Sequence, residues 1–123
     1  MNVLVDTSVW VRFLANRAPY AARPDELLSR DEVNGHAFVC GGLLIGDRGG
    51  RNELLADYEW MDQAPLVPHM DVVAFVRDRK LNGREIGWID AHLPASALVG
   101  RLKLWTADPA LATVATELGI AYE

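Results

Sequence analysis

Three aspartates occupy the same local setting in this chain, because each follows a short apolar segment and precedes an expected helix. Asp6 follows Val3-Leu4-Val5, Asp90 follows Gly87-Trp88-Ile89, and Asp108 follows Leu104-Trp105-Thr106-Ala107. In an open parallel α/β sheet, the carboxyl ends of the strands and the adjacent helix starts line one crevice, where ligands bind. We therefore expect the three carboxylates to converge there. Hard oxygen ligands of this kind select Mg²⁺ or Mn²⁺.

Each aspartate also has a purely structural interpretation. Asp6 could cap a helix in competition with its two hydroxyl neighbours, Asp90 could favour a helix N-terminus, and Asp108 before Pro109 is close to an ideal N-cap. The repeated placement at the ends of three segments also indicates a metal site, and both interpretations stay open on spacing alone. A cation held by such acids can orient a phosphodiester and lower the pKa of bound water. A remaining carboxylate could hold a second ion or act as a general base.

Composition limits the classes of protein to which the chain can belong. Its 123 residues suit one domain, expected to span residues 1–123, and a net charge of −5 gives no global attraction to nucleic acid. Any contact with nucleic acid would need a local basic patch or a bridging metal. The best candidate patch is Arg77, Arg79, Lys80 and Arg84, although charge alone favours a solvated helix face there.

The single cysteine, Cys40, excludes an intramolecular disulfide and a cysteine-rich zinc site, which fits a reducing cytoplasm. The N-terminus enters a strand pattern at once, so we expect no signal peptide. No apolar run approaches the roughly 20 residues of a membrane helix. We therefore expect a cytoplasmic protein.

The hydrophobic pattern predicts an alternation of strands and helices. Strands are expected at residues 2–5, 66–67, 101–106 and 120–122, and a turn at 31–35. Helices are expected near 9–15, 25–30, 39–46, 51–61, 70–80 and 90–99, with a last helix that begins at Asp108-Pro109 and ends before Gly119. This alternation implies a mainly parallel sheet between helix layers, which is a three-layer α/β/α class of fold.

These segments together resemble the PIN-domain family, and specifically the VapC-type ribonuclease toxins of type II toxin–antitoxin systems. The resemblance is carried by residues 3–10, 86–93, 95–98 and 104–108, and Gly87-Trp88-Ile89-Asp90-Ala91-His92-Leu93 is its most specific string. It implies a PIN-like fold and an endoribonuclease that uses Mg²⁺ or Mn²⁺. It assigns the catalytic, metal-binding acids to Asp6, Asp90 and Asp108, and a catalytic hydroxyl to Thr106. It also implies an RNA substrate, a homodimer and a cognate antitoxin protein.

The chain departs from the family pattern at Gly42. The family usually has Val-x-Gly-Glu-Leu-x-x-Gly in a helix, whereas this sequence reads Val39-Cys40-Gly41-Gly42-Leu43-Leu44-Ile45-Gly46. Asp47 cannot replace the missing glutamate, because five residues rotate about 140° around a helix. We expect a chain that folds normally, binds metal more weakly, and cuts RNA poorly or not at all. Either the glutamate was removed because the active toxin is harmful, or the protein naturally works without it or has lost catalysis.

Other functions stay open at this point. A catalytically inactive PIN domain could act as an antitoxin- or RNA-binding module. A phosphoacceptor signalling domain is disfavoured, because Asp6 is single and Lys103 lies inside an expected strand. Trp88 beside Asp90 could stack an unpaired RNA base, while Trp60 and Trp88 could also serve a dimer face or an antitoxin groove. Pro94 is expected to kink the helix slightly beside Asp90.

Overall fold

The computed structural model describes residues 2–16 and 23–122. Four strands and seven helices follow one another there as β1 (Val3–Val5), α1 (Thr7–Leu14), α2 (Arg23–Ser29), β2 (Val33–Gly35), α3 (Ala37–Ile45), α4 (Asn52–Tyr58), β3 (Asp62–Gln63), α5 (His69–Asp78), α6 (Trp88–Gly100), β4 (Lys103–Trp105) and α7 (Pro109–Glu117). Within the described ranges, no helix combines the length and the apolar character needed to cross a membrane.

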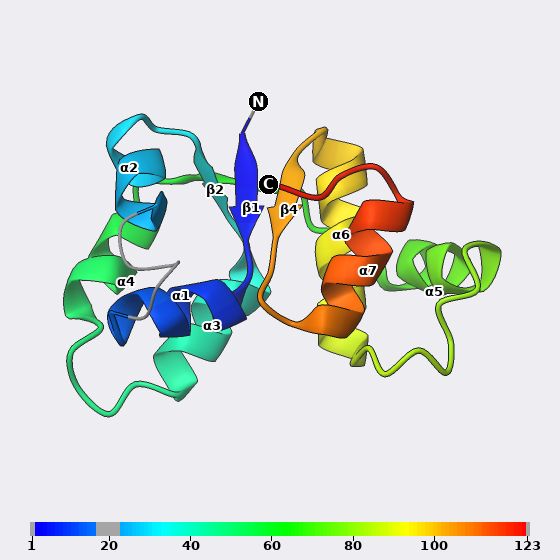
Figure 1. Ribbon diagram of the computed structural model, residues 1–123, viewed down its shortest axis with the longest axis horizontal. Coiled ribbons are helices and arrows are strands. Elements are labelled where there is room, and N and C mark those ends of the chain that lie inside the picture. The colour runs from blue at the N-terminus through cyan, green and yellow to red at the C-terminus, as the bar shows by residue number, and fades with distance from the viewer. Residues whose placement is uncertain (1, 17–22, 123) are drawn as a thin grey trace.

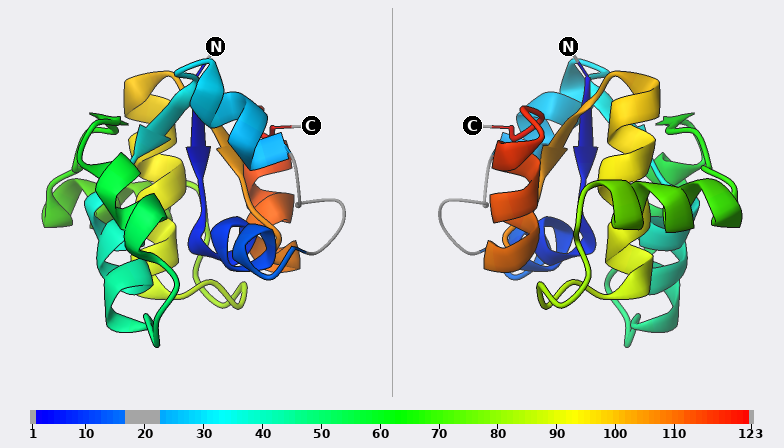
Figure 2. Two further views of the ribbon diagram at one scale, coloured as in Figure 1. Left: turned by 90° about the vertical axis from the view of Figure 1, so that its left-hand side faces the viewer. Right: turned by 90° about the vertical axis from the view of Figure 1, so that its right-hand side faces the viewer.

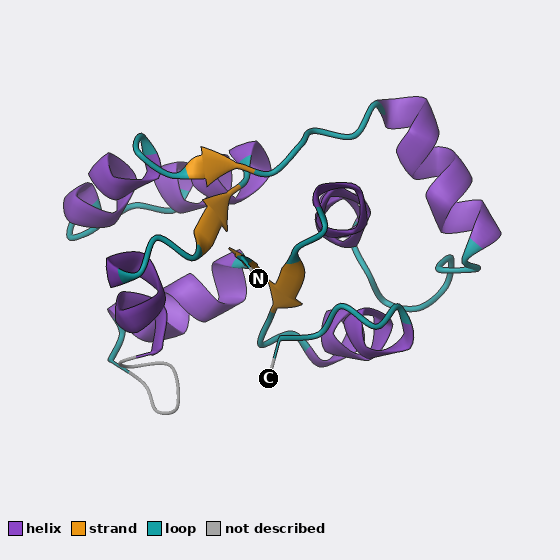
Figure 3. Cartoon of the chain, turned by 90° about the horizontal axis from the view of Figure 1, so that it is seen from above, coloured by secondary structure: helices purple, strands orange, loops and turns teal. Residues whose placement is uncertain are grey.

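The four strands form one parallel sheet in the order β3-β2-β1-β4. The central strand β1 pairs with β4 in the register Val3 with Lys103, Leu4 with Leu104 and Val5 with Trp105. Helices cover both sides, with α1 and α2 on one side of the sheet and α6 on the other (Figures 1 and 3). The predicted three-layer α/β/α fold with a parallel sheet is therefore confirmed.

The main core surrounds β1, whose three residues are all buried. Helix α1 adds Trp10, helix α3 adds Leu43, and β4 adds Leu104, each almost completely buried. A smaller second core joins α5 to α6 through Val72, Ala91 and Ala95. Helix α5 lies outside the three layers and packs on α6, away from the sheet (Figures 1 and 2). The position of α6 is thus fixed from two sides.

The N-terminal ends of α1, α6 and α7 all lie at the lower edge of the view in Figure 1, where β1 and β4 end. For α1 and α7 this arrangement follows from the parallel sheet, since β1 and β4 lead into these helices at the same edge, whereas α6 follows α5 with no strand between them. It brings residues that are about as far apart in the sequence as this chain allows to one end of the molecule.

Three segments of the sheet were predicted wrongly. Residues 66–67 are not a strand, and Leu66 is exposed between Pro65 and Pro68, which lack the N–H groups that a sheet needs. The segment expected as a turn at 31–35 instead contains β2, which pairs with β1, and β3 pairs with β2. Residues 120–122 contribute a single bridge, from Ala121 to Leu104, rather than a full strand.

Helix α6 begins at Trp88, two residues before the expected start, and includes Pro94 in its interior. Because proline has no N–H, the carbonyl of Asp90 lacks one intrahelical hydrogen bond. Helices α1 and α3 likewise begin two residues earlier than the pattern predicted. Such shifts at helix ends leave the positions of the faces unchanged.

Gly35 provides a test of the tight packing where β2 meets α4. A Cβ on Gly35 would lie 2.8 Å from Tyr58 Cε1 and 2.6 Å from Gln63 Nε2, and the Tyr58 ring is buried. We expect Gly35→Ala to lower the free energy of unfolding by about 1–3 kcal/mol, as overpacking does. Urea denaturation measures this change.

Gly41 serves as the control for that substitution. It lies on the exposed side of α3, and no described atom stands within 4 Å of its added Cβ. Gly41→Ala should raise the free energy of unfolding by about 0.5–1 kcal/mol, because alanine is the better helix residue. Equal effects of the two substitutions would show that crowding at Gly35 is not the cause.

Candidate active site

The candidate site begins where β1 and β4 end side by side. The pairing of Val5 with Trp105 puts Asp6 and Thr106 next to each other, and the Asp6 N–H donates to the Trp105 carbonyl at 2.9 Å. Two segments separated by about the whole length of the chain thus meet through main-chain hydrogen bonds. The position of Asp6 relative to the last expected acid is set by the sheet itself.

Two hydroxyls orient the buried carboxylate of Asp6. Ser8 Oγ donates to Asp6 Oδ2 at 2.7 Å, and Thr106 Oγ1 donates to the same oxygen at 2.8 Å. Among the described residues no hydrogen bond engages Asp6 Oδ1, so that oxygen is available to a ligand. The interpretation of Asp6 as a side-chain helix cap is wrong, because its carboxylate makes no cap hydrogen bond in α1.

The hydroxyls also connect Asp6 to Asp108. Thr106 Oγ1 accepts the Asp108 N–H at 3.1 Å, and Ser8 Oγ accepts the Ala107 N–H at 2.9 Å. Asp108 caps α7 through Oδ1, which accepts the Ala110 N–H at 3.0 Å. Its structural role as an N-cap is therefore real and uses one carboxylate oxygen, while the second oxygen remains for other contacts.

Asp90 lies in the first turn of α6 and shares an electrostatic environment with the other two acids. Its pKa is raised above the ordinary value, first because burial removes water from the carboxylate, and then because Asp6 and Asp108 are negative. The structure therefore brings the three predicted acids within electrostatic reach of one another. Their mutual repulsion is what a bound cation would relieve.

Gly42 stands on α3 beside the same site. A Cβ placed on Gly42 would lie 3.6 Å from Thr7 Oγ1, an ordinary contact, with no other described atom within 4 Å. Asp47 lies beyond the end of α3 and accepts the Gly49 N–H at 2.8 Å. Space for a longer side chain is therefore open at position 42, next to the residue that follows Asp6.

The carboxylates fit a hard cation in their chemistry but fall short in number. In the described part of the chain, no group of three or more His, Cys, Asp or Glu side chains is arranged to hold a metal ion. Asp6 and Asp108 each have one oxygen that is already taken by hydroxyl or backbone donors. A glutamate at position 42 would supply a further oxygen donor from α3.

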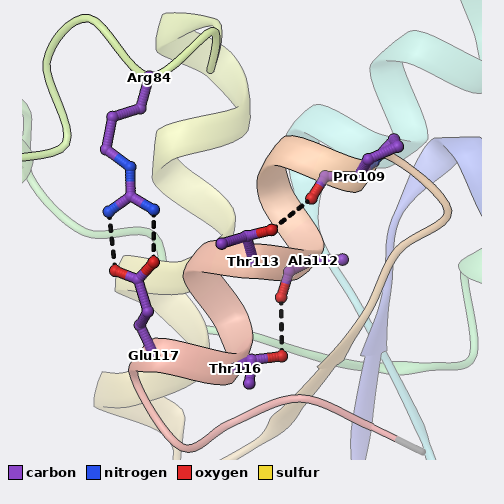
Figure 4. A network of polar contacts seen from close by, with 6 residues as sticks. All are labelled: Arg84, Pro109, Ala112, Thr113, Thr116 and Glu117. Atoms are coloured by element: carbon purple, nitrogen blue, oxygen red, sulfur yellow. Dashed lines mark hydrogen bonds and ion pairs between the residues drawn. The ribbon is translucent and has the colours of Figure 1, made fainter.

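The four residues of the expected basic patch separate into two environments. Arg77, Arg79 and Lys80 are exposed at the end of α5. Arg84 instead forms a bidentate ion pair with Glu117 of α7, at 2.8 and 2.5 Å (Figure 4). This pair raises the pKa of Arg84 and lowers that of Glu117. The charge of Arg84 is thus largely compensated within the protein.

Comparison with known proteins identifies the family to which the chain belongs. The family model for the PIN domain matches residues 3–117. The chain belongs to the PIN-domain family. It is 42% identical over 120 residues to the protein named Ribonuclease VapC32 from Mycobacterium tuberculosis, in both strain CDC 1551 / Oshkosh and strain ATCC 25618 / H37Rv, covering 97% of this chain and 94% of that protein. The match supports the VapC type within the family.

Two solved structures share the fold of this PIN domain. FitAcB from Neisseria gonorrhoeae gives a TM-score of 0.65 at 23% identity and covers 93% of each chain. PAE2754 from Pyrobaculum aerophilum gives a TM-score of 0.56 at 15% identity, covering 97% of this chain and 90% of the other. At these identities the likeness describes the fold alone.

Sequence reasoning missed two residues that organise the site of the PIN domain. Ser8 was considered only as a helix cap, although its hydroxyl contacts Asp6 and the Ala107 N–H. His36 is completely buried, caps α3 by accepting the Phe38 N–H at Nδ1, and so donates from Nε2 to Ser96 Oγ of α6 at 3.0 Å. Burial and the nearby His92 lower its pKa to about 4. Spacing does not signal the contact of Ser8 with Ala107 or that of His36 with Ser96, because these partners lie far away in the sequence.

The raised pKa of Asp90 predicts a measurable effect on stability. A carboxyl whose pKa is higher in the folded than in the unfolded state destabilises the fold as pH rises through that interval. Without metal, Asp90→Asn should therefore unfold at a higher urea concentration than the parent at pH 7. The difference should narrow as pH falls toward the ordinary aspartate pKa of 3.8.

Asp71 is the matched control, since it occupies the first turn of α5 and is exposed. Asp71→Asn should give no gain in stability at any pH. A gain at Asp71 equal to that at Asp90 would mean that the charge cluster is not the source of the effect.

Proposed function

We propose that this PIN domain is the toxin of a VapC-type toxin–antitoxin pair, a metal-dependent endoribonuclease whose activity is impaired by Gly42. The observation that carries the proposal is the gathering of Asp6, Asp90 and Asp108 near the common end of β1 and β4, where Thr106 contacts both Asp6 and Asp108 and the charges of both reach Asp90. The relative named Ribonuclease VapC32, at 42% identity, supplies the class of reaction. The reaction is hydrolysis of an RNA phosphodiester bond.

Asp6, Asp90 and Asp108 are the residues that would hold Mg²⁺ or Mn²⁺. A bound ion of this kind supplies charge stabilisation at the phosphate and a more acidic water. Asp6 and Asp108 each offer one oxygen, since their Oδ2 and Oδ1 atoms respectively are engaged within the protein. With three acids instead of four, we expect weak binding of the ion.

The protein's own groups orient the site. Ser8 and Thr106 fix the Asp6 carboxylate, and the Thr106 hydroxyl also accepts the Asp108 N–H, so one threonine sets the spacing of two acids. Asp90 has a raised affinity for protons. A bound ion would offset the charges of Asp6 and Asp108 and so lower that affinity, which leaves the Asp90 carboxylate as an oxygen donor to the ion.

A second candidate function is an inactive PIN domain that binds its antitoxin or RNA. Gly42 favours it, because the described residues contain no complete set of metal ligands. Both functions involve a cognate antitoxin protein, and we propose a cytoplasmic homodimer for both. Cleavage of RNA separates them.

Restoring the missing acid is the decisive experiment. The variant Gly42→Glu should bind Mn²⁺ at least about tenfold more tightly and cleave RNA faster than the parent chain, because a fourth carboxylate joins the cluster beside Thr7. Isothermal titration measures the affinity for Mn²⁺, and a gel assay with structured RNA measures cleavage. EDTA should abolish cleavage by the restored variant.

Gly41→Glu is the matched control, because it adds the same charge one residue away, about 100° around the same helix. The control should leave both Mn²⁺ affinity and cleavage unchanged. Equal cleavage by the parent chain and Gly42→Glu would contradict the impairment. No cleavage by either, with intact binding of RNA, would favour the inactive module.

The basic residues at the end of α5 predict a dependence on salt. Replacing Arg77, Arg79 and Lys80 by alanine should weaken RNA binding and reduce the slope of log K against log salt by about 0.7 for each phosphate that these side chains neutralise. Arg84→Ala should leave that slope unchanged, because Arg84 is paired with Glu117. Fluorescence anisotropy between about 50 and 300 mM salt, where screening of charges changes strongly, tests both expectations. A reduced slope for Arg84→Ala alone would place the phosphate contact at Arg84.

A further inference from the structure

A hollow of about 210 Å³ lies between the end of α5, the loop before α6 and the first turn of α6. Its apolar lining comes from Val76, Leu81, Ile86, Trp88 and Ala91. Ala91 belongs to the second core, and Val76 and Ile86 pack against it, so one wall is apolar and fixed. Asn82, Gly83 and Gly87 are exposed and form its open rim. The hollow is therefore a preformed apolar recess with a polar entrance.

Trp88 forms one side of the recess and is held in place. Its ring makes edge contacts with His69, at 5.1 Å between centroids, and with His92, at 4.9 Å. His92 Nδ1 also contacts the Trp88 carbonyl at 2.9 Å. The residue nevertheless remains 42% exposed. A fixed and partly open indole gives up little conformational freedom when a flat ligand stacks on it.

The loop before α6, which forms one wall of the recess, is anchored by an ion pair to α7. Arg84 lies between the lining residues Gly83 and Ile86, and its bidentate ion pair with Glu117 joins the loop to α7 (Figure 4). Helix α7 begins at the Asp108 cap. The loop beside the recess is therefore joined to the C-terminal end of α7, the helix whose N-terminal end carries Asp108.

Gly87 connects the recess directly to Asp90. It lines the recess, and a Cβ placed on Gly87 would lie 3.8 Å from Asp90 Oδ2. The Asp90 carboxylate therefore lies close to the side of the recess that Gly87 forms. A chain that continues out of the recess would pass the Asp90 carboxylate.

The volume of the recess and the charge of the residues beside it indicate which kind of ligand it could bind. Pockets for drug-sized ligands measure roughly 300–1,000 Å³, so this recess suits a smaller flat group such as one nucleobase. An apolar wall and an indole favour an aromatic ring. The cations Arg77, Arg79 and Lys80 lie in the chain between the lining residues Val76 and Leu81 and are exposed, which suits the phosphates that flank a base.

We propose that this recess binds one unpaired base of the RNA substrate, with Trp88 as its stacking platform, beside the phosphodiester presented to Asp90. This inference rests on the proposed function for the identity of the ligand as RNA. A base within a duplex is stacked on both sides and cannot enter, so the recess selects unpaired nucleotides. Base–aromatic stacking tolerates any base. Trp88 would therefore distinguish unpaired RNA from duplex RNA, and not one base sequence from another.

The test is RNA binding in EDTA, where cleavage does not occur. Fluorescence anisotropy compares an unpaired octanucleotide of mixed sequence, about the site size of one single-strand binding fold, with the same strand in a duplex. The parent protein should bind the unpaired strand more tightly than the duplex. Trp88→Ala should bind the unpaired strand with an affinity about 5- to 150-fold lower, which corresponds to the loss of about 1–3 kcal/mol of stacking free energy. Trp88→Phe should retain most of the affinity, since it keeps an aromatic face.

Trp60 provides the matched control, because it is 86% exposed and lines a different hollow next to α2 and α4. Trp60→Ala should bind the unpaired strand as the parent does. Circular dichroism and urea denaturation establish that each variant is folded. If Trp88→Ala is unfolded, the affinities of folded Trp88→Phe and folded Trp88→Leu for the unpaired strand are compared instead. Trp88→Leu removes the aromatic face, so it should bind more weakly than Trp88→Phe, and equal affinities would overturn the proposal.

The outcomes for the recess and for the enzyme are distinguishable. Unchanged affinity in Trp88→Ala, an equally weakened Trp60→Ala, or equal binding of duplex and unpaired strand would overturn the base recess, even if Gly42→Glu cleaves RNA. A weakened affinity confined to Trp88 would support the recess, even if no variant cleaves and the protein is a binding module.

Discussion

The parallel pairing of β1 with β4 is the constraint on which the rest of the molecule depends. It is a buried, main-chain interaction between the two ends of the sequence, and it brings Asp6 and Thr106 into hydrogen-bond contact. Water is largely absent there, so the charge of Asp6 is stabilised mainly by the hydroxyls of Ser8 and Thr106 and by whatever ligand meets its free oxygen. The helices then add the other acids around this fixed carboxylate.

The second core fixes the position of the first turns of α6. A helix that carries a functional acid in its first turn must hold that turn in place, although helix ends fray easily. Val72 of α5 packs against Ala91 and Ala95 immediately after Asp90, while His36 ties Ser96 to the start of α3. Helices α3 and α6 are thereby linked, so position 42 and Asp90 keep their relative places.

The sequence pattern was informative where local chemistry determines structure. The apolar runs before Asp6 and Asp108 predicted β1 and β4, and Asp108-Pro109 predicted the start of α7. Val33-Asn34-Gly35 and Asp62-Gln63 carried no such signal, because those strands exist through pairing with β1 and with each other. The same limit applies to the site. The placement of Asp6 and Asp108 follows from the strands that precede them. The position of Asp90, the contact of Ser8 with Ala107, the ion pair of Arg84 and the bond between His36 and Ser96 depend instead on partners that only the fold supplies.

Two groups that belong to or contact α6 respond to acid in opposite directions. Protonation of Asp90 relieves repulsion among the acids, so it favours the folded state as pH falls. His36, which is bonded to Ser96 of the same helix, acts in the other direction. Its folded pKa is about 4 against an ordinary 6.5, so the unfolded chain takes up the proton first, and stability decreases as pH falls from 6.5 toward 4. Asp90 and His36 therefore act in opposite directions on the pH dependence of stability, and only substitution of one residue at a time would reveal how strongly each pKa is perturbed.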